Sequence, residues 1–540
     1  MNLAAKKIKD EKASEDFNPS FADDLRVIGK AKNKVDGTML AKGQAAYVED
    51  RVKSDSLFVK MLRSPHAHAI ITSIDTSEAA NIPGVEYILT HENAPETRYS
   101  SAGQGFPEPS PYDRRLIDKK VRFVGDRVAA VAATSLEIAQ EAISKIKVEY
   151  EILKPVLSIE DARKEDAPII QDYDISKNPL HIGADISKNI AAHNADGIGD
   201  ADKALQEAEF TIERVYKTSP IQCTPLEPHV VHTHIENDRL IIHASTQVPW
   251  HMRRIIASIL NIKENKIRVI KEKVGGGFGA KQDIVVEDIA SWITWQTGKP
   301  VFFRFTREEE FISSRLRHPM EIKIKLGMKK DGTITALDME VLANTGPYGV
   351  HALTVPMNAC SKSLSLFKCA DVKYSVTAYY TNYPISGAYQ GYGAPQGSFA
   401  VQMTLAEAAE QLGIDFYELL RKNHVTAGYN LEILKCLGEG QEGIAQTITT
   451  CALGEALEKG KELIGLGKKE VSDNPDIKIG KAAVIIQQGS GLPGIDAANA
   501  EVKMMGDGNF MLLIGGTDLG TGLDTMAAKM VAECLEVDVE

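Results

Sequence analysis

Three glycine-rich stretches hold the residues of this 540-residue chain whose types and spacing suit ligand chemistry. They are 274–282 (VGGGFGAKQ), 390–397 (QGYGAPQG) and 515–522 (GGTDLGTG). Glycine permits tight turns and positive φ, which would explain one such loop without any ligand. Each of the three follows an extended segment, however, and successive backbone N–H groups in such loops bind anions. The pattern therefore indicates loops that together hold a large, flat ligand bearing phosphates.

A dinucleotide-binding loop is an alternative interpretation of the first stretch. Gly275, Gly277 and Ala280 fit the pattern G-x-G-x-x-A, between a predicted strand and a predicted helix. An acidic residue that binds ribose should follow about 20 residues later, but the nearest candidate, Glu308, comes late. The sequence also lacks G-x-S-x-G, the Walker motif and H-E-x-x-H, which argues against hydrolase and nucleoside-triphosphatase chemistry.

Two histidine pairs could suggest a metal site. His66 with His68, and His232 with His234, would each lie on one face of a strand. Zinc needs three or four converging ligands, and no other His or Cys spacing completes either pair. The six cysteines include no C-x-x-C, so they form no iron–sulphur or zinc pattern. We therefore expect structural histidines, no metal bound directly by the protein, and a chain of the reducing cytoplasm.

The overall charge and hydropathy exclude two classes of partner. A formal net charge of −12 argues against binding to nucleic acid, which needs a basic surface. No run of 18 apolar residues occurs, so no membrane span is expected. Residues 1–24 are charged and lack an apolar centre, so they are predicted to be a mobile leader rather than a secretion signal.

The elements that must position these loops indicate a mixed α/β chain of several domains. Residues 121–153 show a strand, a helix with Thr134 as its predicted cap, and a second strand. The polar stretch 156–199 has the composition of a linker. A hairpin is predicted to turn at Asp331-Gly332. Residues 477–525 show strands and glycine loops, and the sequence ends as a helix running towards another strand, which indicates an incomplete last domain.

Four motifs, in this order, carry a resemblance to a known family. They are STQ (245–247), GGGFGAKQ (275–282), TNYPISGAYQGYGAPQ (381–396) and GGTDLGTGLDT (515–525). Together they resemble the molybdenum-binding subunit of the xanthine dehydrogenase and aldehyde oxidase family. The resemblance implies an α+β, mixed α/β fold. Its expected parts are an α/β hammerhead domain (25–155), the linker (156–199), a first molybdopterin-binding domain (200–430) and the start of a second (431–540).

The resemblance implies a molybdenum–molybdopterin cofactor, in its cytosine dinucleotide form, held almost wholly by the backbone. The implied cofactor-binding residues are Gln247, Gly277, Phe278, Gly279, Gln390, Gly391, Gly520, Thr521 and Gly522. The implied reaction is hydroxylation of an electron-poor carbon with oxygen taken from water. Electrons would pass to an Fe–S subunit and an FAD subunit, because this chain has no cysteine pattern for clusters.

Departures from the family pattern bear on the substrate. Gln390 stands where the family has an arginine, so a fixed positive charge beside the metal is expected to be lost. In the implied substrate pocket, Gln282 and Asn358 replace the glutamate and the arginine that orient purines, while Tyr392 keeps the aromatic ring. Loss of both charged contacts argues against xanthine, since a neutral pocket lacks charge-assisted recognition. Another N-heteroaromatic, purine-like or nicotinate-like, or an aldehyde is left open.

A further departure concerns the catalytic base. The family's general-base glutamate lies in a C-terminal part that no residue here matches. Either another chain supplies it, as in split enzymes resembling nicotinate dehydrogenase, or the sequence is a truncated and catalytically silent fragment. A Rossmann-type dehydrogenase is the more distant alternative.

Overall fold

The computed structural model describes residues 25–44, 46–103, 105–468, 470–489 and 497–539. The leader predicted over 1–24 lies outside these residues. The chain divides into two compact units, one formed by Tyr47–Ala497 and the other by the two ends of the chain, up to Ala46 and from Ala498 onward. No helix in the described ranges is both long enough and apolar enough to span a bilayer.

A seven-stranded mixed sheet forms one half of the larger unit, with strand order β11-β10-β9-β12-β1-β5-β3. Its strands are β1 (Leu57–Arg63), β3 (Val85–Thr90), β5 (Arg127–Ala133), β9 (Val230–Glu236), β10 (Arg239–Ala244), β11 (Ile267–Lys271) and β12 (Val301–Arg304). β1 pairs with β12 in parallel and with β5 antiparallel. One sheet thus joins segments that the sequence assigned to two different domains.

Helices cover this sheet, and three further strands form a separate small sheet. Helices α7 (Pro249–Leu260), α8 (Glu287–Thr297), α4 (Leu136–Lys145) and α3 (Ser77–Ala80) pack on its strands or on one another, and β4 (Lys120–Val121), β2 (Ala69–Asp75) and β6 (Lys147–Ile152) form a three-stranded sheet. The cap of α4 is Ser135, whose side chain accepts from the Ile138 N–H, and not the predicted Thr134. The Thr134 N–H instead donates to the Gly84 carbonyl, one residue before β3 begins.

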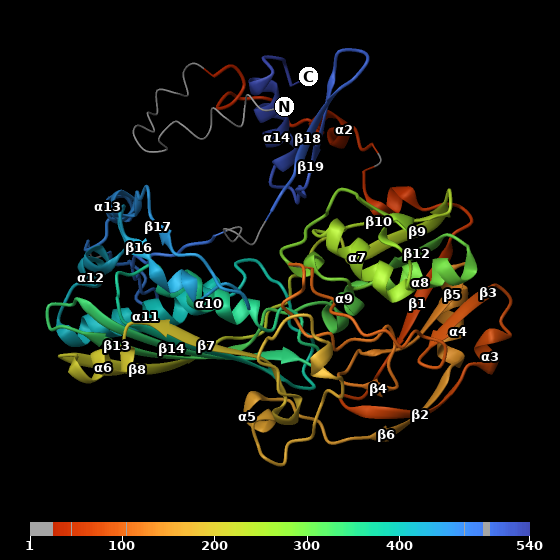
Figure 1. The fold of residues 1–540 in the computed structure, drawn as a ribbon, viewed down its shortest axis with the longest axis horizontal. Coiled ribbons are helices and arrows are strands. Elements are labelled where there is room, and N and C mark those ends of the chain that lie inside the picture. Colours follow the sequence, from red (N-terminus) through yellow and green to blue (C-terminus); the bar gives the residue numbers. More distant parts are fainter. Residues whose placement is uncertain (1–24, 45, 104, 469, 490–496, 540) are drawn as a thin grey trace. The chain divides into compact units, whose positions relative to one another are not determined.

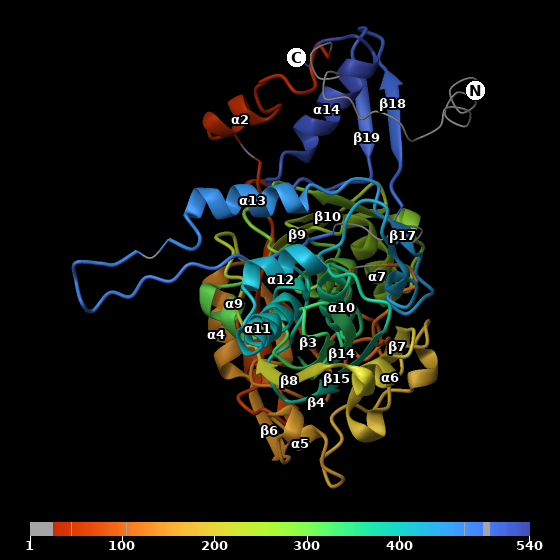
Figure 2. The same cartoon turned by 90° about the vertical axis from the view of Figure 1, so that its left-hand side faces the viewer.

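A five-stranded sheet, ordered β7-β15-β14-β13-β8, forms the other half of the larger unit. Its strands are β7 (Ile190–Ile198), β8 (Phe210–Lys217), β13 (Met320–Met328), β14 (Ile334–Gly346) and β15 (Val372–Tyr380). α10 (Thr354–Leu364) and α11 (Ala394–Leu412) lie side by side on it (Figures 1 and 2). The hairpin between β13 and β14 turns at Gly332 (φ +83°), as predicted.

The linker prediction is wrong for part of 156–199. β7 occupies residues 190–198 and pairs antiparallel with β15, which makes it an edge strand of the five-stranded sheet. Its sequence, IAAHNADGI, is small and polar, so it lacks the apolar alternation that would reveal a strand. Residues 477–489, inside the part predicted as strands, form neither helix nor strand in the described structure. An alternating sequence becomes a strand only when another strand binds its backbone.

The remaining elements of the larger unit are short. They are α5 (Ile159–Ala162), α6 (Ala201–Glu207), α9 (Arg307–Ser313), α12 (Phe416–Asn423), β16 (Asn430–Leu431), β17 (Gln446–Thr447) and α13 (Leu453–Ile464).

The smaller unit combines both ends of the described chain. It contains α2 (Gly37–Ala41), β18 (Ala500–Met504), β19 (Phe510–Ile514) and α14 (Leu523–Cys534). The backbone N–H groups of residues 26–28 donate to the Glu533 carboxylate of α14 at 2.7–3.0 Å. Residues 25–44 and 46 therefore belong with the C-terminal segment, and the hammerhead domain does not begin at 25 as expected.

A stack of three histidines crosses β9 and β10. The ring centroids of His234 and His243 lie 5.6 Å apart, and His232 lies 5.6 Å from His234. Burial, together with the neighbouring His234, His243 and Lys53, lowers the pKa of His232 to about 4. In the unfolded chain this residue takes up a proton near pH 6.5, whereas in the folded chain it does so only near pH 4.

Stability should therefore fall as pH decreases through this window. Above pH 6.5 His232 is neutral in both the folded and the unfolded state, so it contributes no pH dependence. Between about pH 6.5 and 4 the loss in the free energy of unfolding should reach the order of 2 kcal/mol. Thermal unfolding midpoints measured from pH 7.5 to 5 would check this. The variant His232→Gln should show a shallower decline, whereas the exposed control His181→Gln should follow the wild type. Equal slopes for wild type and His232→Gln would contradict the assignment.

Candidate cofactor site

The first glycine loop lies beside Gln247 because of how two strands pair. β10 and β11 are parallel neighbours, so their carboxyl ends meet at one edge of the sheet. Gln247 follows β10, and residues 274–279 follow β11. The Gly279 N–H donates to Gln247 Oε1 at 3.0 Å. A Cβ at Gly277 would lie 2.7 Å from the same oxygen, so a larger residue there would displace the Gln247 side chain.

The second glycine loop contacts the first through its backbone. The Gln390 N–H donates to the Phe278 carbonyl at 2.7 Å, and a Cβ at Gly279 would lie 2.7 Å from the Tyr389 backbone. Phe278 itself has a positive φ of 51° and a side chain that is 48% exposed. Gly391 also has positive φ (+89°). The structure thus brings Gln247, Gly277, Phe278, Gly279, Gln390 and Gly391 together, as expected for one site.

Two carboxylates, the half-buried Glu227 and the buried Glu310, hold the first loop in place. Glu227 accepts hydrogen bonds from the Gly275 N–H and from Lys281 Nζ, each at 2.7 Å. Glu310 bonds the His229 ring at 2.9 Å, and the other ring nitrogen of His229 lies 3.0 Å from the Ala280 carbonyl oxygen. Burial raises the pKa of Glu310, but His229 outweighs it and holds that pKa at about 2. These side chains make a rigid base for the loop.

Arg317 supplies a positive charge at the second loop that the sequence reasoning missed. Its guanidinium donates to the Gln390 carbonyl at 2.7 Å and lies 3.9 Å from the centre of the Tyr389 ring. A cation from a residue 73 positions away in sequence thus contacts the backbone of Gln390, while the expected loss of a fixed charge beside the metal stays a prediction. Such a long-range contact leaves no mark in the local pattern.

The implied substrate residues form a second connected group. Tyr392 bonds Thr354 Oγ1 at 2.7 Å and His351 Nδ1 at 2.6 Å. Asn358, one turn along α10 from Thr354, is buried and donates to the Thr354 carbonyl at 3.0 Å and to the Glu439 carboxylate. Asn358 and Tyr392 are thus linked through one helical turn, and Glu439 is a further residue of this group that no motif indicates.

Gln282 joins this group through its neighbour in the chain. Its N–H donates to the Gly279 carbonyl at 2.9 Å, and its half-buried side chain has no bonded partner among the described residues. The next residue, Asp283, is buried and bonds His351 Nε2 at 2.7 Å and Arg315 Nε at 2.6 Å. The first glycine loop and Tyr392 are therefore connected through the peptide bond between Gln282 and Asp283 and the hydrogen bonds that Asp283 and His351 make.

The third glycine loop belongs to the smaller unit. The buried Asp518 carboxylate accepts from the N–H groups of Gly520, Gly522 and Asp524 at 2.8, 3.2 and 3.1 Å. These donors are therefore already bonded, while Thr521 is exposed. Its contact with the cofactor remains a prediction.

The two histidines of the first pair contact different neighbours. His68 Nδ1 lies 2.9 Å from the Lys154 carbonyl oxygen, and the His66 ring packs edge-on against Tyr150. Within the described parts of the chain, no three His, Cys, Asp or Glu side chains are placed to hold a metal ion.

The dinucleotide-binding interpretation does not fit the sheet. In a Rossmann unit the strand after the helix lies parallel to the strand before the loop, close beside it. Here β12 follows α8, but β10 and β9 separate it from β11, and β9 runs antiparallel to both its neighbours. The glycine loop also leads into a short 3-10 turn before α8 begins at Glu287.

Comparison with known proteins supports the same assignment. Residues 182–424 and 459–540 each match the molybdopterin cofactor-binding domain, and residues 42–154 match the hammerhead domain of aldehyde oxidase and xanthine dehydrogenase. The fold expected from the sequence, a hammerhead domain followed by molybdopterin-binding domains, is confirmed.

Three relatives place the chain within that family. It is 48% identical to a "probable hypoxanthine oxidase" of Escherichia coli strain K12, over 99% of this chain and 58% of that protein. It is 32% identical to the nicotinate dehydrogenase large molybdopterin subunit of Eubacterium barkeri, over 82% of this chain and 99% of that protein. Its structure superposes on the aldehyde oxidoreductase of Desulfovibrio gigas with a TM-score of 0.79 and 26% identity, covering 95% of this chain and 55% of that one.

The chain therefore spans about 58% of the length of the hypoxanthine oxidase relative. The nicotinate dehydrogenase subunit, by contrast, is matched almost from end to end. The chain belongs to the molybdopterin-binding subunits of the xanthine dehydrogenase and aldehyde oxidase family.

Proposed function

We propose that this chain is the molybdopterin-binding subunit of a molybdenum hydroxylase. The enzyme would be an oxidoreductase that oxidises an N-heteroaromatic ring or an aldehyde, with water as the oxygen source. The observation that carries the proposal is the backbone contact between the two glycine loops, where a Cβ at Gly279 would lie 2.7 Å from the Tyr389 backbone. Such close packing of glycine backbone leaves main-chain groups to face a ligand.

The residues present fit a molybdenum cofactor. When bound, that cofactor supplies hydroxylation chemistry that removes two electrons from the substrate. Gln247 Oε1 is engaged by the Gly279 N–H, which leaves the Nε2 donor, unbonded within the described structure, for an oxygen of the bound group. The half-exposed Phe278 ring would cover the metal's face, and Arg317 would hold a positive charge beside it. Gly520–Gly522 would contact the pterin or its phosphate.

The cysteines of this chain bear on which partner subunits the enzyme would need. All six cysteines are free and scattered along the sequence, so Fe–S clusters and FAD would sit on separate subunits. The cofactor would be the cytosine dinucleotide form. A further chain would supply the general-base glutamate. The end-to-end match with the nicotinate dehydrogenase large subunit supports a split arrangement, since that relative is itself named as one subunit of an enzyme.

Purification with the co-expressed partner subunits tests the proposal. The complex should contain about one molybdenum and one pterin per copy of this chain, and it should oxidise heteroaromatic or aldehyde substrates with water-derived oxygen. A complex with every subunit present but no molybdenum would refute it. Absence of both cofactor and turnover is what the silent fragment predicts, whereas a molybdenum-loaded complex that is inactive towards all such substrates would contradict the proposed reaction alone.

Gln282→Glu should change substrate choice and leave cofactor binding intact. The substitution places a carboxylate next to Asp283, in the group connected to Tyr392. We expect the ratio of kcat/KM values for two heteroaromatic substrates to change by about tenfold, the effect of one altered pocket contact. Phe278→Ala serves as the contrasting variant, because it should lower molybdenum content or activity towards every substrate alike. An unchanged substrate profile in Gln282→Glu would show that this residue lies outside the pocket.

A further inference from the structure

The Glu227 carboxylate contacts three segments that meet at one edge of the seven-stranded sheet. A single oxygen of this carboxylate, Oε2, accepts three hydrogen bonds at 2.5–2.7 Å, from the Ser245 hydroxyl, the Gly275 N–H and the Lys281 ammonium. Glu227 lies just before β9, Ser245 directly after β10, and Gly275 shortly after β11. One side-chain oxygen therefore holds the STQ segment (245–247) against the first glycine loop.

Lys281 contacts the STQ segment at both of its ends. Its ammonium donates to Ser245 Oγ at 2.9 Å, and its main-chain carbonyl accepts from the Gln247 N–H at 2.9 Å. The Gln247 side chain is held separately, because its Oε1 atom accepts from the Gly279 N–H. A shift of the STQ segment would therefore also move the Gln247 side chain relative to the glycine loop.

The Lys281 side chain is fully buried, which is an unusual position for an ammonium group. None of that side chain is exposed, and burial lowers the pKa of the ammonium although the Glu227 charge raises it. Moving a charge out of water costs free energy, which pairing with a carboxylate often offsets only in part. An apolar side chain would fill the same space without that cost, but it could not bond Ser245 and Glu227 at once. The ion pair is therefore better explained by the position that it imposes than by the stability that it adds.

We propose that Lys281 and Glu227 are positioning residues that act through Gln247. They hold the STQ segment in the one place where the Gln247 Nε2 donor faces the bound cofactor. The inference rests on the proposed function, in which Nε2 donates to an oxygen of that cofactor. A purely structural role for the pair predicts something different, because its loss would then have the same effect whether or not the Gln247 side chain is present.

A double-mutant cycle between Lys281→Met and Gln247→Met tests the inference in the complete, co-purified complex. Methionine approximates the length of both side chains but supplies no N–H donor. Each single variant should lower kcat by at least about tenfold, as is typical when a group that orients a ligand-binding residue is lost. The double variant should stay within about twofold of the more impaired single variant, since Lys281 has nothing left to position. Independent effects would instead multiply to about a hundredfold.

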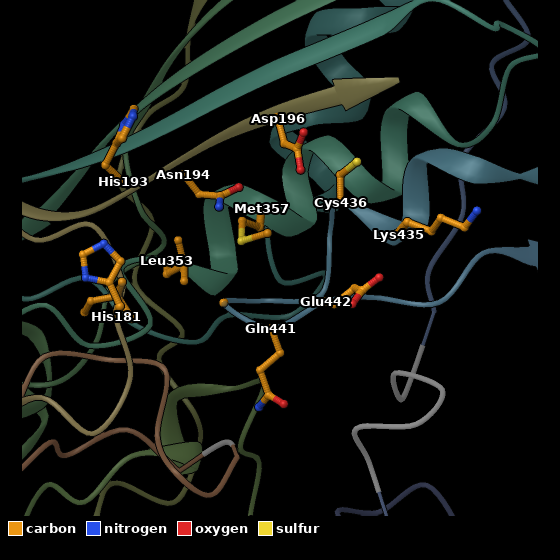
Figure 3. Close-up of a pocket in the computed structure, with 12 residues that line it drawn as sticks. His181, His193, Asn194, Asp196, Leu353, Met357, Lys435, Cys436, Gln441 and Glu442 are labelled. Carbon is orange, nitrogen blue, oxygen red and sulfur yellow. The ribbon is translucent and has the colours of Figure 1, made fainter. Parts of the chain in front are cut away.

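The electron paramagnetic resonance spectrum of Mo(V) gives a readout that does not depend on turnover. Recorded on the partly reduced complex, it should shift in the same direction in Lys281→Met and in Gln247→Met, because both variants alter the same donor. Lys435→Met is the matched control. Lys435 is exposed, pairs with Glu432 at 2.5 Å and lines a pocket of about 320 Å³ beside α10 that includes none of the residues named above (Figure 3). Its kcat and spectrum should equal those of the wild type.

Ser245→Ala provides a second and milder variant, which decides the question even if Lys281→Met does not accumulate. It removes the hydroxyl through which the Lys281 ammonium holds the STQ segment, yet it leaves the ion pair between Lys281 and Glu227 in place. We expect a smaller loss of kcat and a smaller shift of the Mo(V) spectrum in the same direction. A role in charge pairing alone would leave both unchanged.

Two results would overturn the inference. One is a double variant in which the losses from Lys281→Met and Gln247→Met multiply. The other is a Ser245→Ala complex, normally loaded with molybdenum, that matches the wild type in kcat and in spectrum. A wild-type complex without molybdenum would instead refute the proposed function, so the two failures are distinguishable. In a loaded but inactive complex the same comparisons are made on the spectra.

Discussion

Replacing Gly279 by alanine should lower the molybdenum content of the purified complex by at least about tenfold, since strain of order 2–4 kcal/mol is introduced where the two loops meet. The residue has a φ of +97°, and an added Cβ would lie 2.7 Å from the Tyr389 backbone, which cannot rotate away as a side chain could. The loops would separate, and the Gly279 N–H would lose its bond to Gln247. Metal analysis of the complex provides the measurement.

Gly298→Ala is the matched control for that experiment. Gly298 also has positive φ (+69°), but an added Cβ would meet nothing within 4 Å. It lies at the end of α8, where the change should cost only about 1 kcal/mol of backbone strain and leave molybdenum content unaltered. If both variants lost the metal equally, general instability rather than loop geometry would be the cause, and the assignment of the loop would fail.

Asp288→Asn should destabilise the larger unit by about 3–5 kcal/mol, because it leaves a buried guanidinium without its counter-charge. Arg127 of β5 donates to both oxygens of Asp288 at 2.8 and 3.0 Å, and the Tyr99 hydroxyl donates at 2.7 Å. Burial opposes ionisation, but Arg127 and Tyr99 together keep the pKa of Asp288 below its ordinary value. Both charged side chains are nearly inaccessible to solvent.

Urea unfolding followed by tryptophan fluorescence would measure this effect. The three tryptophans, Trp250, Trp292 and Trp295, all lie on α7 and α8, so the signal reports on the unit that contains Asp288. Glu86→Gln is the control, since it breaks the exposed pair with Lys299 and should cost less than about 1 kcal/mol. A loss in Asp288→Asn no greater than in Glu86→Gln would mean that Arg127 finds another partner.

Local pattern predicted much of the fold. The hairpin at Gly332 and the helix of residues 136–145 both follow from periodicity and turn chemistry within a few residues. β7 was missed because its strand character depends on β15, about 180 residues away, and not on its own composition. The same reason explains why residues 477–489 form no strand. Their sequence alternates as in a strand, but no other strand pairs with them in the described structure.

The same distinction between local and long-range contacts applies to the candidate site. Glycine motifs predicted the contact between the loops of Gly279 and Gln390, because backbone approach demands a residue without a side chain. Arg317 and Glu439 could not be predicted, since each acts through a partner 73 or 81 positions away. Both change the electrostatics that Gln390 and Asn358 alone suggested. Motifs therefore predicted which loops form the candidate site, whereas the charged residues near these loops could be seen only in the folded chain.

The parallel pairing of β1 with β12 has a consequence for synthesis. The two strands begin at residues 57 and 301, so β1 is made 244 residues (301 − 57) before its partner. Because translation proceeds at about 5–20 residues per second, one edge of β1 lacks its final partner strand for on the order of 12–50 seconds during synthesis. An edge strand in that condition can pair with other chains. The hammerhead segment thus has to be shielded during translation, and slow expression or a co-expressed chaperone should raise the yield of folded subunit.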